Sequence, residues 1–313
     1  DALYFSQFDI EEAVIPSQII VIKSCSFYNH KKLKSVKFSP NTECKAIEGY
    51  AFASSGIIAL SIPESVDQIS EACFSNIHNL REIKISPKNK KFKLINDKLV
   101  VKESVAGSGN FDVIIFARRD IESIEIPSNI KVIGHYAFEY CEHLETVTFE
   151  SDSSLESIKS SAFHRIAGQE RLVLPSSLKE AEYNSFSFIK NVKLIEFLGK
   201  SVKIEDECFY SCNNLESVTF PNADEITFGF DSMEETPESA KILVKRNAKL
   251  SGNGLNDCDR RIEYIESPSE KSVQKVHLKK RRRKVSKSSI KEDTEKSKER
   301  DEDKDEGLTQ KDK

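Results

Sequence analysis

A phenylalanine returns at nearly constant spacing along most of this 313-residue chain. The steps between successive copies are 22, 25, 22, 64, 25, 23 and 23 residues, and the copies are Phe5, Phe27, Phe52, Phe74, Phe138, Phe163, Phe186 and Phe209. A period of this length is typical of solenoids, in which each repeat forms one coil and buries its apolar edge against the next. The sequence therefore predicts stacked coils with a column of phenylalanines through the core.

The neighbours of the phenylalanine recur too, most clearly in residues 121–144. Ile124, Glu125 and Ile126 alternate with the period of two that a half-buried strand shows. Pro127 then ends the strand, because proline has no N–H for a further ladder bond. Each coil is thus predicted to be a short strand, a turn and a return segment that brings Phe138 to the core. Successive strands are expected to stack in parallel into one curved sheet.

The 64-residue step is the exception, and it predicts an insertion over residues 92–117. Two strand-like pieces, residues 98–102 and 112–117, flank a polar segment whose Gly107 and Gly109 suit a hairpin loop. We expect a β-hairpin that projects from the solenoid, and a degenerate repeat unit is the alternative. The register also places Phe5 at a repeat position, so we expect the array to begin before Asp1.

The unit resembles the BspA-type leucine-rich repeat. The features that carry the resemblance are the strand with its proline, the Ala-Phe pair and the Cys/Ser-x-x-Leu turn, as in residues 121–144 and 197–220. The resemblance covers residues 1–231 and implies a leucine-rich-repeat solenoid, α/β or mainly β. It also implies a non-enzymatic surface for ligand binding or adhesion, as in a surface antigen. The chain departs from the pattern after Phe149 and Phe197, where the proline is missing.

The predicted binding surface is the outward face of the stacked strands. One residue from each strand is expected to line up there in a column: Lys37, Ser61, Lys84, Glu125, Thr148, Val173, Glu196 and Thr219. Lysines early in the column give way to glutamates later, which suits an extended protein partner. Ordinary solvated strand residues are the alternative interpretation. Tyr136, Tyr140, His143 and Tyr210 in the turns form a second candidate patch, because tyrosine is favoured at interfaces.

Charge narrows the class of partner. The chain holds 47 basic and 51 acidic residues, of which residues 267–313 contribute 16 and 11. The remainder, 31 basic against 40 acidic residues, has a net charge of −9. Such a body repels phosphate, so nucleic acid is disfavoured as a partner. A protein partner is expected, and carbohydrate stays open.

Motifs for catalysis are missing from the sequence. It holds no GxSxG, HExxH or GxxxxGK[ST] pattern, and its six histidines are scattered without metal-ligand spacing. We therefore expect no catalytic residue, metal or cofactor. Cysteines such as Cys73 and Cys208 stand directly before a repeat phenylalanine, where other units carry alanine or serine. They are interpreted as buried apolar fillers and not as a disulfide framework.

The composition changes near the C-terminus. Residues 232–266 are expected to close the solenoid with strands at 242–244 and 262–265. Residues 267–313 contain no aromatic residue and are rich in charge, so we expect them to be disordered. They include a basic run, which consists of Lys279, Lys280, Arg281, Arg282, Arg283 and Lys284. Candidate phosphorylation sites follow it at Ser286, Ser288 and Ser289, where phosphate would lower the local positive charge.

The location of the protein stays open between two hypotheses. The family resemblance indicates the cell surface, whereas the basic run is typical of a nuclear-import signal or an acidic-lipid contact. No asparagine begins an Asn-x-Ser/Thr sequon, and no apolar run approaches the ~20 residues of a membrane helix. A surface adhesin and an intracellular or nuclear adaptor are therefore both carried forward. A solvated polyampholyte that only keeps the protein in solution is the third interpretation of the tail.

Overall fold

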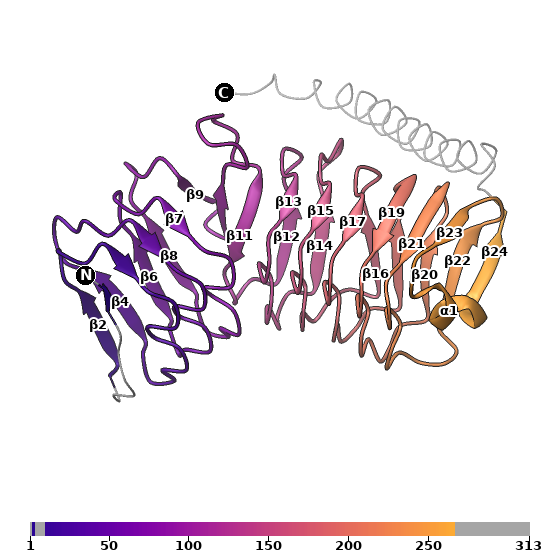
Figure 1. Cartoon of the computed structure of the whole chain (residues 1–313), viewed down its shortest axis with the longest axis horizontal. Coiled ribbons are helices and arrows are strands. Elements are labelled where there is room, and N and C mark those ends of the chain that lie inside the picture. The colour runs from indigo at the N-terminus through magenta and orange to yellow at the C-terminus, as the bar shows by residue number, and fades with distance from the viewer. Residues whose placement is uncertain (1, 4–9, 267–313) are drawn as a thin grey trace, which may run out of the picture. The chain divides into compact units, whose positions relative to one another are not determined.

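The computed structural model of this chain describes residues 2–3 and 10–266. Its compact first unit comprises residues 1–265. Phe5 and the charged segment 267–313 lie outside the described residues, as do the basic run and the three candidate phosphorylation sites. The described part is a β-solenoid of stacked coils, which confirms the predicted fold class (Figure 1).

Nearly every coil contributes a four-residue strand to one side of the solenoid. These strands are β2 (Glu12–Ile15), β4 (Ser35–Phe38), β6 (Ala59–Ile62), β8 (Glu82–Ile85), β12 (Ser123–Ile126), β14 (Thr146–Phe149), β16 (Arg171–Leu174), β18 (Leu194–Phe197), β20 (Ser217–Phe220), β22 (Lys241–Lys245) and β24 (Ile262–Ile265). Neighbours pair in parallel within three sheets, β2–β8, β12–β14 and β16–β24. We call their outward side the strand face.

The return segment of each coil also forms a strand, so the solenoid has a second, opposite side. Its strands are β1 (Ala2–Leu3), β3 (Val21–Ile22), β5 (Ala46–Ile47), β7 (Gln68–Ile69), β9 (Phe92–Ile95), β10 (Leu99–Lys102), β11 (Val113–Ala117), β13 (Val132–Ile133), β15 (Ser157–Ile158), β17 (Glu180–Ala181), β19 (Ser201–Ile204), β21 (Glu225–Phe228) and β23 (Lys249–Ser251). They form one four-stranded and one nine-stranded sheet. We call this side the short-strand side.

A tight turn between the two strands holds the phenylalanine. In the coil of Phe138, the residues two before and two after it, Tyr136 and Tyr140, have φ of 59° and 58°. Left-handed backbone at non-glycine residues costs about 1–2 kcal/mol each, so something must hold them there. Backbone bonds between coils do so, as when the Phe138 N–H donates to the Ala162 carbonyl at 2.8 Å.

The phenylalanines form two columns of stacked rings. Phe27, Phe52 and Phe74 follow one another at centroid distances of 5.3 and 6.1 Å. The second column runs from Phe138 to Phe209, with centroids 5.0, 5.6 and 6.0 Å apart. Met233, which is 4% exposed, occupies the repeat position that follows Phe209 by 24 residues. The coil pattern therefore continues past residue 231 into the segment expected to close the solenoid.

The insertion lies within the sheet. β9, β10 and β11 form an antiparallel meander, and β11 then pairs in parallel with β13. The antiparallel partnership of 98–102 with 112–117 is present, but the expectation that these strands project from the solenoid is wrong. The reason is hydrophobic: Phe116 is 1% exposed and packs on Phe74 at a centroid distance of 5.0 Å. The insertion fills the place of a missing coil.

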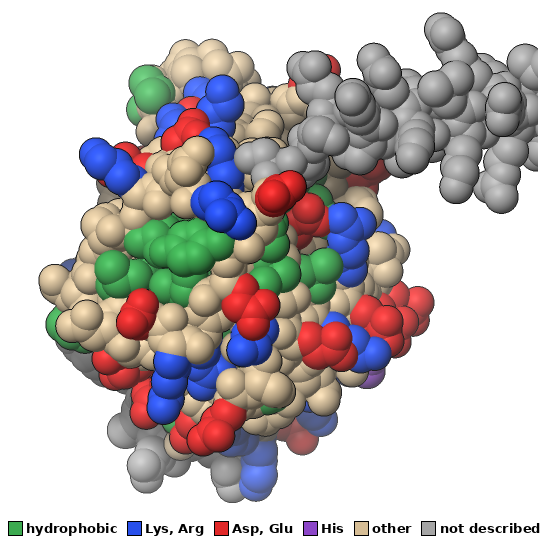
Figure 2. Space-filling model, turned by 90° about the vertical axis from the view of Figure 1, so that its right-hand side faces the viewer, with side chains coloured by type: hydrophobic (Ala, Val, Ile, Leu, Met, Phe, Trp, Pro, Cys, Tyr) green, Lys and Arg blue, Asp and Glu red, His purple; other side chains and the backbone are tan. Residues whose placement is uncertain are grey.

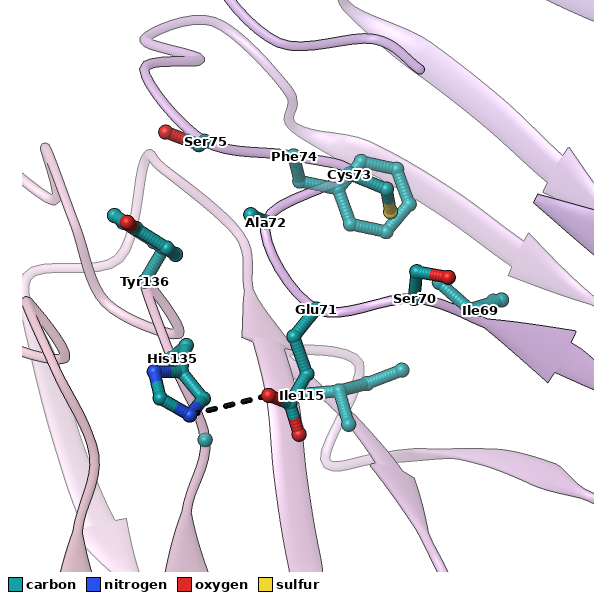
Figure 3. A pocket seen from close by; sticks show the side chains of 11 residues that line it. Ile69, Ser70, Glu71, Ala72, Cys73, Phe74, Ser75, Ile115, His135 and Tyr136 are labelled. Atoms are coloured by element: carbon teal, nitrogen blue, oxygen red, sulfur yellow. Dashed lines mark ion pairs between the residues drawn. The ribbon is translucent and has the colours of Figure 1, made fainter. Parts of the chain in front are cut away.

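The insertion divides the solenoid into two stacks. We call residues 10–91 the N-terminal stack and residues 92–266 the C-terminal stack. In the described part of the chain no ladder joins β7 to β9 or β8 to β12, and the buried residues form two separate hydrophobic clusters. One backbone bond, from the Arg119 N–H to the Leu80 carbonyl at 3.0 Å, and several side chains bridge the joint. One example is the His135 Nε2–Glu71 Oε2 contact of 3.1 Å, shown in Figure 3.

Arg119 is the central residue of this joint. It is 2% exposed, and its guanidinium lies 4.2 Å from the centre of the Phe116 ring. It donates hydrogen bonds to backbone carbonyls of both stacks, at 3.0 Å to Ile77 and 2.9 Å to Ala137. In regular coils such carbonyls accept bonds from the backbone of a neighbouring coil. The Ala137 carbonyl also accepts the Ala117 N–H at 2.9 Å, so there the guanidinium adds to the backbone bond.

The last coil differs from the others. The short helix α1 (Leu255–Cys258) and the 3₁₀ turn η1 (Asp259–Arg261) replace the usual tight turn and lead into β24. β24 and β23 are the outermost strands of their sheets, and Tyr264 is 56% exposed. Figure 2 shows apolar side chains gathered at this end of the solenoid, within a ring of charged groups. Strands occur where the sequence predicted them, at 241–245 and 262–265.

Candidate functional site: the strand face

The register of the strands brings the predicted column together. Ser61 lies beside Lys84, Glu125 beside Thr148, and Glu196 between Val173 and Thr219. The parallel, in-register stacking of equal strands is the cause, since side chains at equal repeat positions then point the same way. The column also includes residues that the sequence interpretation left out, Val14 opposite Lys37 and Leu243 opposite Thr219. The column is interrupted between β8 and β12 and between β14 and β16, where no ladder forms, and the β4–β6 ladder stops before Lys37 and Ser61.

Exposure differs along the column. Lys37, Ser61, Lys84, Glu125 and Thr148 are exposed. Val173 and Glu196 are half-buried, whereas Thr219 is only 9% exposed. The expectation that Thr219 is available at the surface is therefore wrong. It lies between Glu196 and Leu243 in register, and larger neighbours on both sides cover a short side chain.

Ion pairs between coils neutralise parts of the face. Lys37 Nζ lies 2.6 Å from Glu12 Oε2, and Arg171 pairs with Glu196. Hydrogen bonds from Lys37 and then from Ser35 lower the pKa of Glu12. These pairs are exposed on at least one side, so each contributes little to stability.

The net charge changes sign between the two stacks. The N-terminal stack holds 11 basic and 8 acidic residues, a net charge of +3, and the C-terminal stack holds 20 and 30, a net charge of −10. The change from lysine to glutamate along the column thus parallels the change in net charge from the N-terminal to the C-terminal stack. A charged partner would meet fields of opposite sign on the two halves of the face.

Two grooves open on the strand face, both at the C-terminal ends of strands. The first has a volume of about 520 Å³ and lies over β4, β6 and β8. Its lining includes Phe38, Asn41, Ser61, Pro63 and Lys84. The second measures about 440 Å³ and lies over β14 and β16. It is lined in part by Thr148, Phe149, Asp152, Val173 and Leu198.

Both grooves follow from an elongated turn, which we call a long turn. The next buried residue usually comes four positions after the strand, as from Ile62 to Val66, but it comes six positions after Phe38, at Cys44. Phe149 and Leu155 show the same spacing of six. The two phenylalanine steps of 25 residues that contain these turns carried the signal in the sequence. That signal was present, but the sequence interpretation did not use it.

A glutamine side chain widens the second groove. No backbone ladder joins β14 to β16; instead the Gln169 Oε1 accepts the Val147 N–H at 2.8 Å, and its Nε2 donates to the Val147 carbonyl at 3.2 Å. Gly168, with φ of 73°, turns the chain so that Gln169 enters this place. A side chain thus replaces strand pairing and keeps β14 and β16 apart.

The second candidate patch is a stack of rings along the turns. His78, Tyr140, His164, Phe188 and Tyr210 contact one another in that order, with centroids 4.0, 5.8, 5.2 and 5.4 Å apart. We call these five residues the aromatic edge. The structure thus brings together Tyr140 and Tyr210 of the predicted patch.

Tyr136 and His143 lie apart from the aromatic edge. Tyr136 is half-buried beside Tyr50, and burial followed by the Tyr50 contact raises its pKa to about 12. His143 is exposed. Because the rings of the aromatic edge pack against each other in tilted and T-shaped arrangements, the edge fits a stabilising role better than a free binding surface.

Reactive groups are sparse in the described part of the chain. All seven cysteines are unpaired, and all but Cys25 are buried. Burial raises the pKa of the Cys141 and Cys208 thiols, which disfavours the thiolate that nucleophilic chemistry needs. Within residues 2–3 and 10–266, no three His, Cys, Asp or Glu side chains are grouped to hold a metal ion. Over the same residues, no helix has both the length and the apolar character to cross a membrane.

Comparison with known proteins agrees with the repeat geometry. A model of the BspA type leucine rich repeat region matches six copies over residues 2–98 and 111–230, which is more than half of the chain. The chain belongs to the BspA-type leucine-rich-repeat family. The unmatched residues 99–110 cover β10 and the loop that follows it, where the insertion departs from the repeat.

Solved structures share the fold of this leucine-rich-repeat chain. The pneumococcal vaccine antigen PcpA superposes with a TM-score of 0.64 at 19% identity, covering 83% of this chain and 67% of the other. A leucine-rich repeat protein from Eubacterium ventriosum has a TM-score of 0.62 at 16% identity, covering 84% and 79%. Among curated proteins, no sequence matches. At these identities the similarity shows the fold alone.

Proposed function

We propose that this leucine-rich-repeat protein is a non-enzymatic binding protein whose strand face holds an extended segment of a partner protein. The observation that carries the proposal is the register of the strand face, where side chains of paired coils line up in a column, exposed from Lys37 to Thr148, beside two grooves. Where the strands are paired, an extended chain that crosses the coils would meet one such side chain at every strand spacing, about 4.8 Å. Repeat proteins use elongated surfaces of this kind for binding.

Site-specific crosslinking tests this proposal. A photoreactive amino acid is placed at Lys37 or Glu125 on the strand face, and at Gln68 or Ser201 on the short-strand side as matched exposed controls. The expected result is one discrete protein adduct from both strand-face positions and none from the controls. Adducts only from the control positions would contradict the proposal, and an adduct with a glycan would replace protein with carbohydrate as the ligand.

The two hypotheses for location remain proposals. A cell-surface adhesin is supported by the family and by the fold shared with PcpA, which is described as a vaccine antigen. An intracellular or nuclear adaptor is supported by the basic run 279–284. Tagged full-length protein in its own cells separates them, with the six basic residues either kept or changed to alanine. Surface labelling that survives the change contradicts the adaptor, whereas nuclear signal lost with it contradicts the adhesin.

A further inference from the structure

The two grooves share one structural origin and one position in the repeat. Each long turn holds a residue with left-handed backbone, Asn41 with φ of 56° and Asp152 with φ of 59°, and each of these residues lines its groove. Strand pairing is reduced beside both. The β4–β6 ladder ends at Val36 and Leu60, and β14 and β16 have none. In both places, a turn that is two residues longer than usual accompanies neighbouring strands that are not paired at their C-terminal ends.

The floor of each groove is apolar. Phe38 and Ile85 are half-buried in the first groove, and Phe149, Val173 and Leu198 are half-buried in the second. Partly exposed apolar side chains in a concavity gain free energy when a further apolar group covers them, by about 25 cal/mol per Å². Each groove has room for one or two side chains of an extended peptide.

The rims of the two grooves differ in charge. The second groove is lined by Glu150 and Asp152, both exposed, and no basic residue lines it. Neither carboxylate has a Lys or Arg nitrogen within 4 Å among the described residues. The second groove therefore favours a peptide with lysine or arginine.

The first groove has one lysine and several hydroxyls at its rim. Lys84 lines it together with Ser39, Thr42, Ser61, Ser65 and Ser86. Glu64 also lines it, but Lys88 lies 3.9 Å from that carboxylate. Lysine and hydroxyl donors suit a carboxylate that approaches from outside. The surrounding stack is net positive as well.

We propose that the two long-turn grooves are the anchor sites for the partner segment on the strand face. One apolar side chain of the partner enters each groove. An acidic residue flanks the anchor at the first groove, and a basic residue flanks it at the second. This polarity fixes the direction in which the segment crosses the coils. The inference rests on the proposed function, because it assigns the contacts that the strand face makes.

Short labelled peptides test the anchors without the natural partner. The probes are fluorescein-labelled Lys-Thr-Val-Lys-Thr and Glu-Thr-Val-Glu-Thr, titrated with the full chain and followed by fluorescence anisotropy. Thr148→Trp fills the second groove, and Thr146→Trp on the same strand is its control. Ser61→Trp fills the first groove, and Ser35→Trp, on β4 and outside the groove lining, is its control. Circular dichroism verifies that each variant is folded.

The basic peptide is expected to bind saturably with a Kd below about 1 mM, and Thr148→Trp is expected to weaken it at least tenfold. Thr146→Trp leaves the Kd within about twofold. The acidic peptide responds in the same way to Ser61→Trp and not to Thr148→Trp. Combined Glu150→Gln and Asp152→Asn, which keep the size of both side chains, remove most of the basic peptide's salt dependence.

Two outcomes overturn the proposal. One is binding of the basic peptide that is equal in Thr148→Trp and Thr146→Trp, and the other is no saturable binding of either peptide up to about 2 mM. Failure of the anchors is distinguishable from failure of the proposed function. If only the anchors are wrong, photoreactive groups at Lys37 and Glu125 still crosslink the partner, and filling the grooves leaves the crosslinking yield unchanged. If the proposed function itself is wrong, the strand-face positions crosslink no partner at all.

Discussion

Single residues in the turns tolerate conformations that isolated residues avoid. Left-handed backbone recurs two positions on either side of each described repeat phenylalanine, and none of these residues is glycine. The coil-to-coil backbone bonds that stabilise them depend on the stack as a whole. Side chains at these turns are also partly buried, and His164 shows the effect of burial most clearly. Its Nδ1 lies 2.7 Å from the Ser187 hydroxyl, and its Nε2 accepts the Arg165 Nε–H at 3.2 Å.

We predict that His164 makes the stability of the fold depend on pH. Burial first, and then Arg165, lower its pKa from 6.5 to about 4. Between these values the unfolded chain binds a proton that the folded chain does not, so this stability is present above pH 6.5 and is lost as the pH falls toward 4. Chemical denaturation at pH 7.5 and pH 4.5 measures the loss.

The matched variant for this prediction is His164→Gln, which keeps a polar side chain that does not titrate. Between pH 7.5 and pH 4.5 the free energy of unfolding is expected to fall less in His164→Gln than in wild type, and the difference between the two losses is up to about 3 kcal/mol. Glu139 acts in the opposite direction, since burial raises its pKa, and it is present in both proteins. An equal loss in wild type and His164→Gln would contradict the prediction.

Among the elements, β9–β11 decide how the two stacks meet. The meander supplies Phe116 to the ring column, and the segment directly after it supplies Arg119, whose guanidinium donates to the carbonyls of Ile77 and Ala137. A second bridge is Glu139, which is 6% exposed and accepts the Asn76 N–H at 2.6 Å. In regular coils the equivalent N–H meets a backbone carbonyl of the next coil, as when Asn29 donates to Ala53. The joint therefore relies on buried polar side chains with specific partners.

Arg119→Met is predicted to destabilise the protein by roughly 2 to 4 kcal/mol, because several buried carbonyls lose their donor at once. Arg118→Met is the matched control, since Arg118 pairs with Asp97 and Asp120 at the surface of the same segment. It should cost about 1 kcal/mol or less. Urea denaturation followed by circular dichroism compares the two. Equal losses would show that the guanidinium of Arg119 does not hold the joint.

The described solenoid as a whole consists of two stacks of unequal core. The hydrophobic cluster on the N-terminal side contains 24 buried residues, of which Phe92, Val100 and Phe116 come from the insertion, and the cluster on the C-terminal side contains 44. In repeat proteins each coil is stabilised mainly by its neighbours, so an interrupted interface limits how far cooperativity extends. The joint is such an interface, because the sheets on both sides of the solenoid are interrupted there.

We predict that the N-terminal stack opens before the C-terminal stack. Its smaller core and the absence of a ladder across the joint allow it to unfold while residues 113–251 stay ordered. Hydrogen exchange resolved by mass spectrometry in increasing urea measures this order. Amides of β4 and β6 should exchange at a lower urea concentration than amides of β16 and β18. Exchange of both groups of amides at the same urea concentration would show that the two stacks unfold as one cooperative unit, which contradicts the prediction.

The sequence by itself determined the repeat, the parallel stacking and the core column. Phe138 and its equivalents are read directly from a fixed period, and a fixed period imposes the same buried position in each coil. The tertiary structure alone decided which outward residues are accessible, because that depends on the neighbouring coils. Thr219 is covered between Glu196 and Leu243, whereas Thr148 stays open beside a long turn. The tertiary structure also decided that the insertion lies within the sheet. There Phe116 packs on Phe74 and Arg119 donates to the Ile77 carbonyl. These contacts join segments that are distant in sequence, so no local pattern contains them.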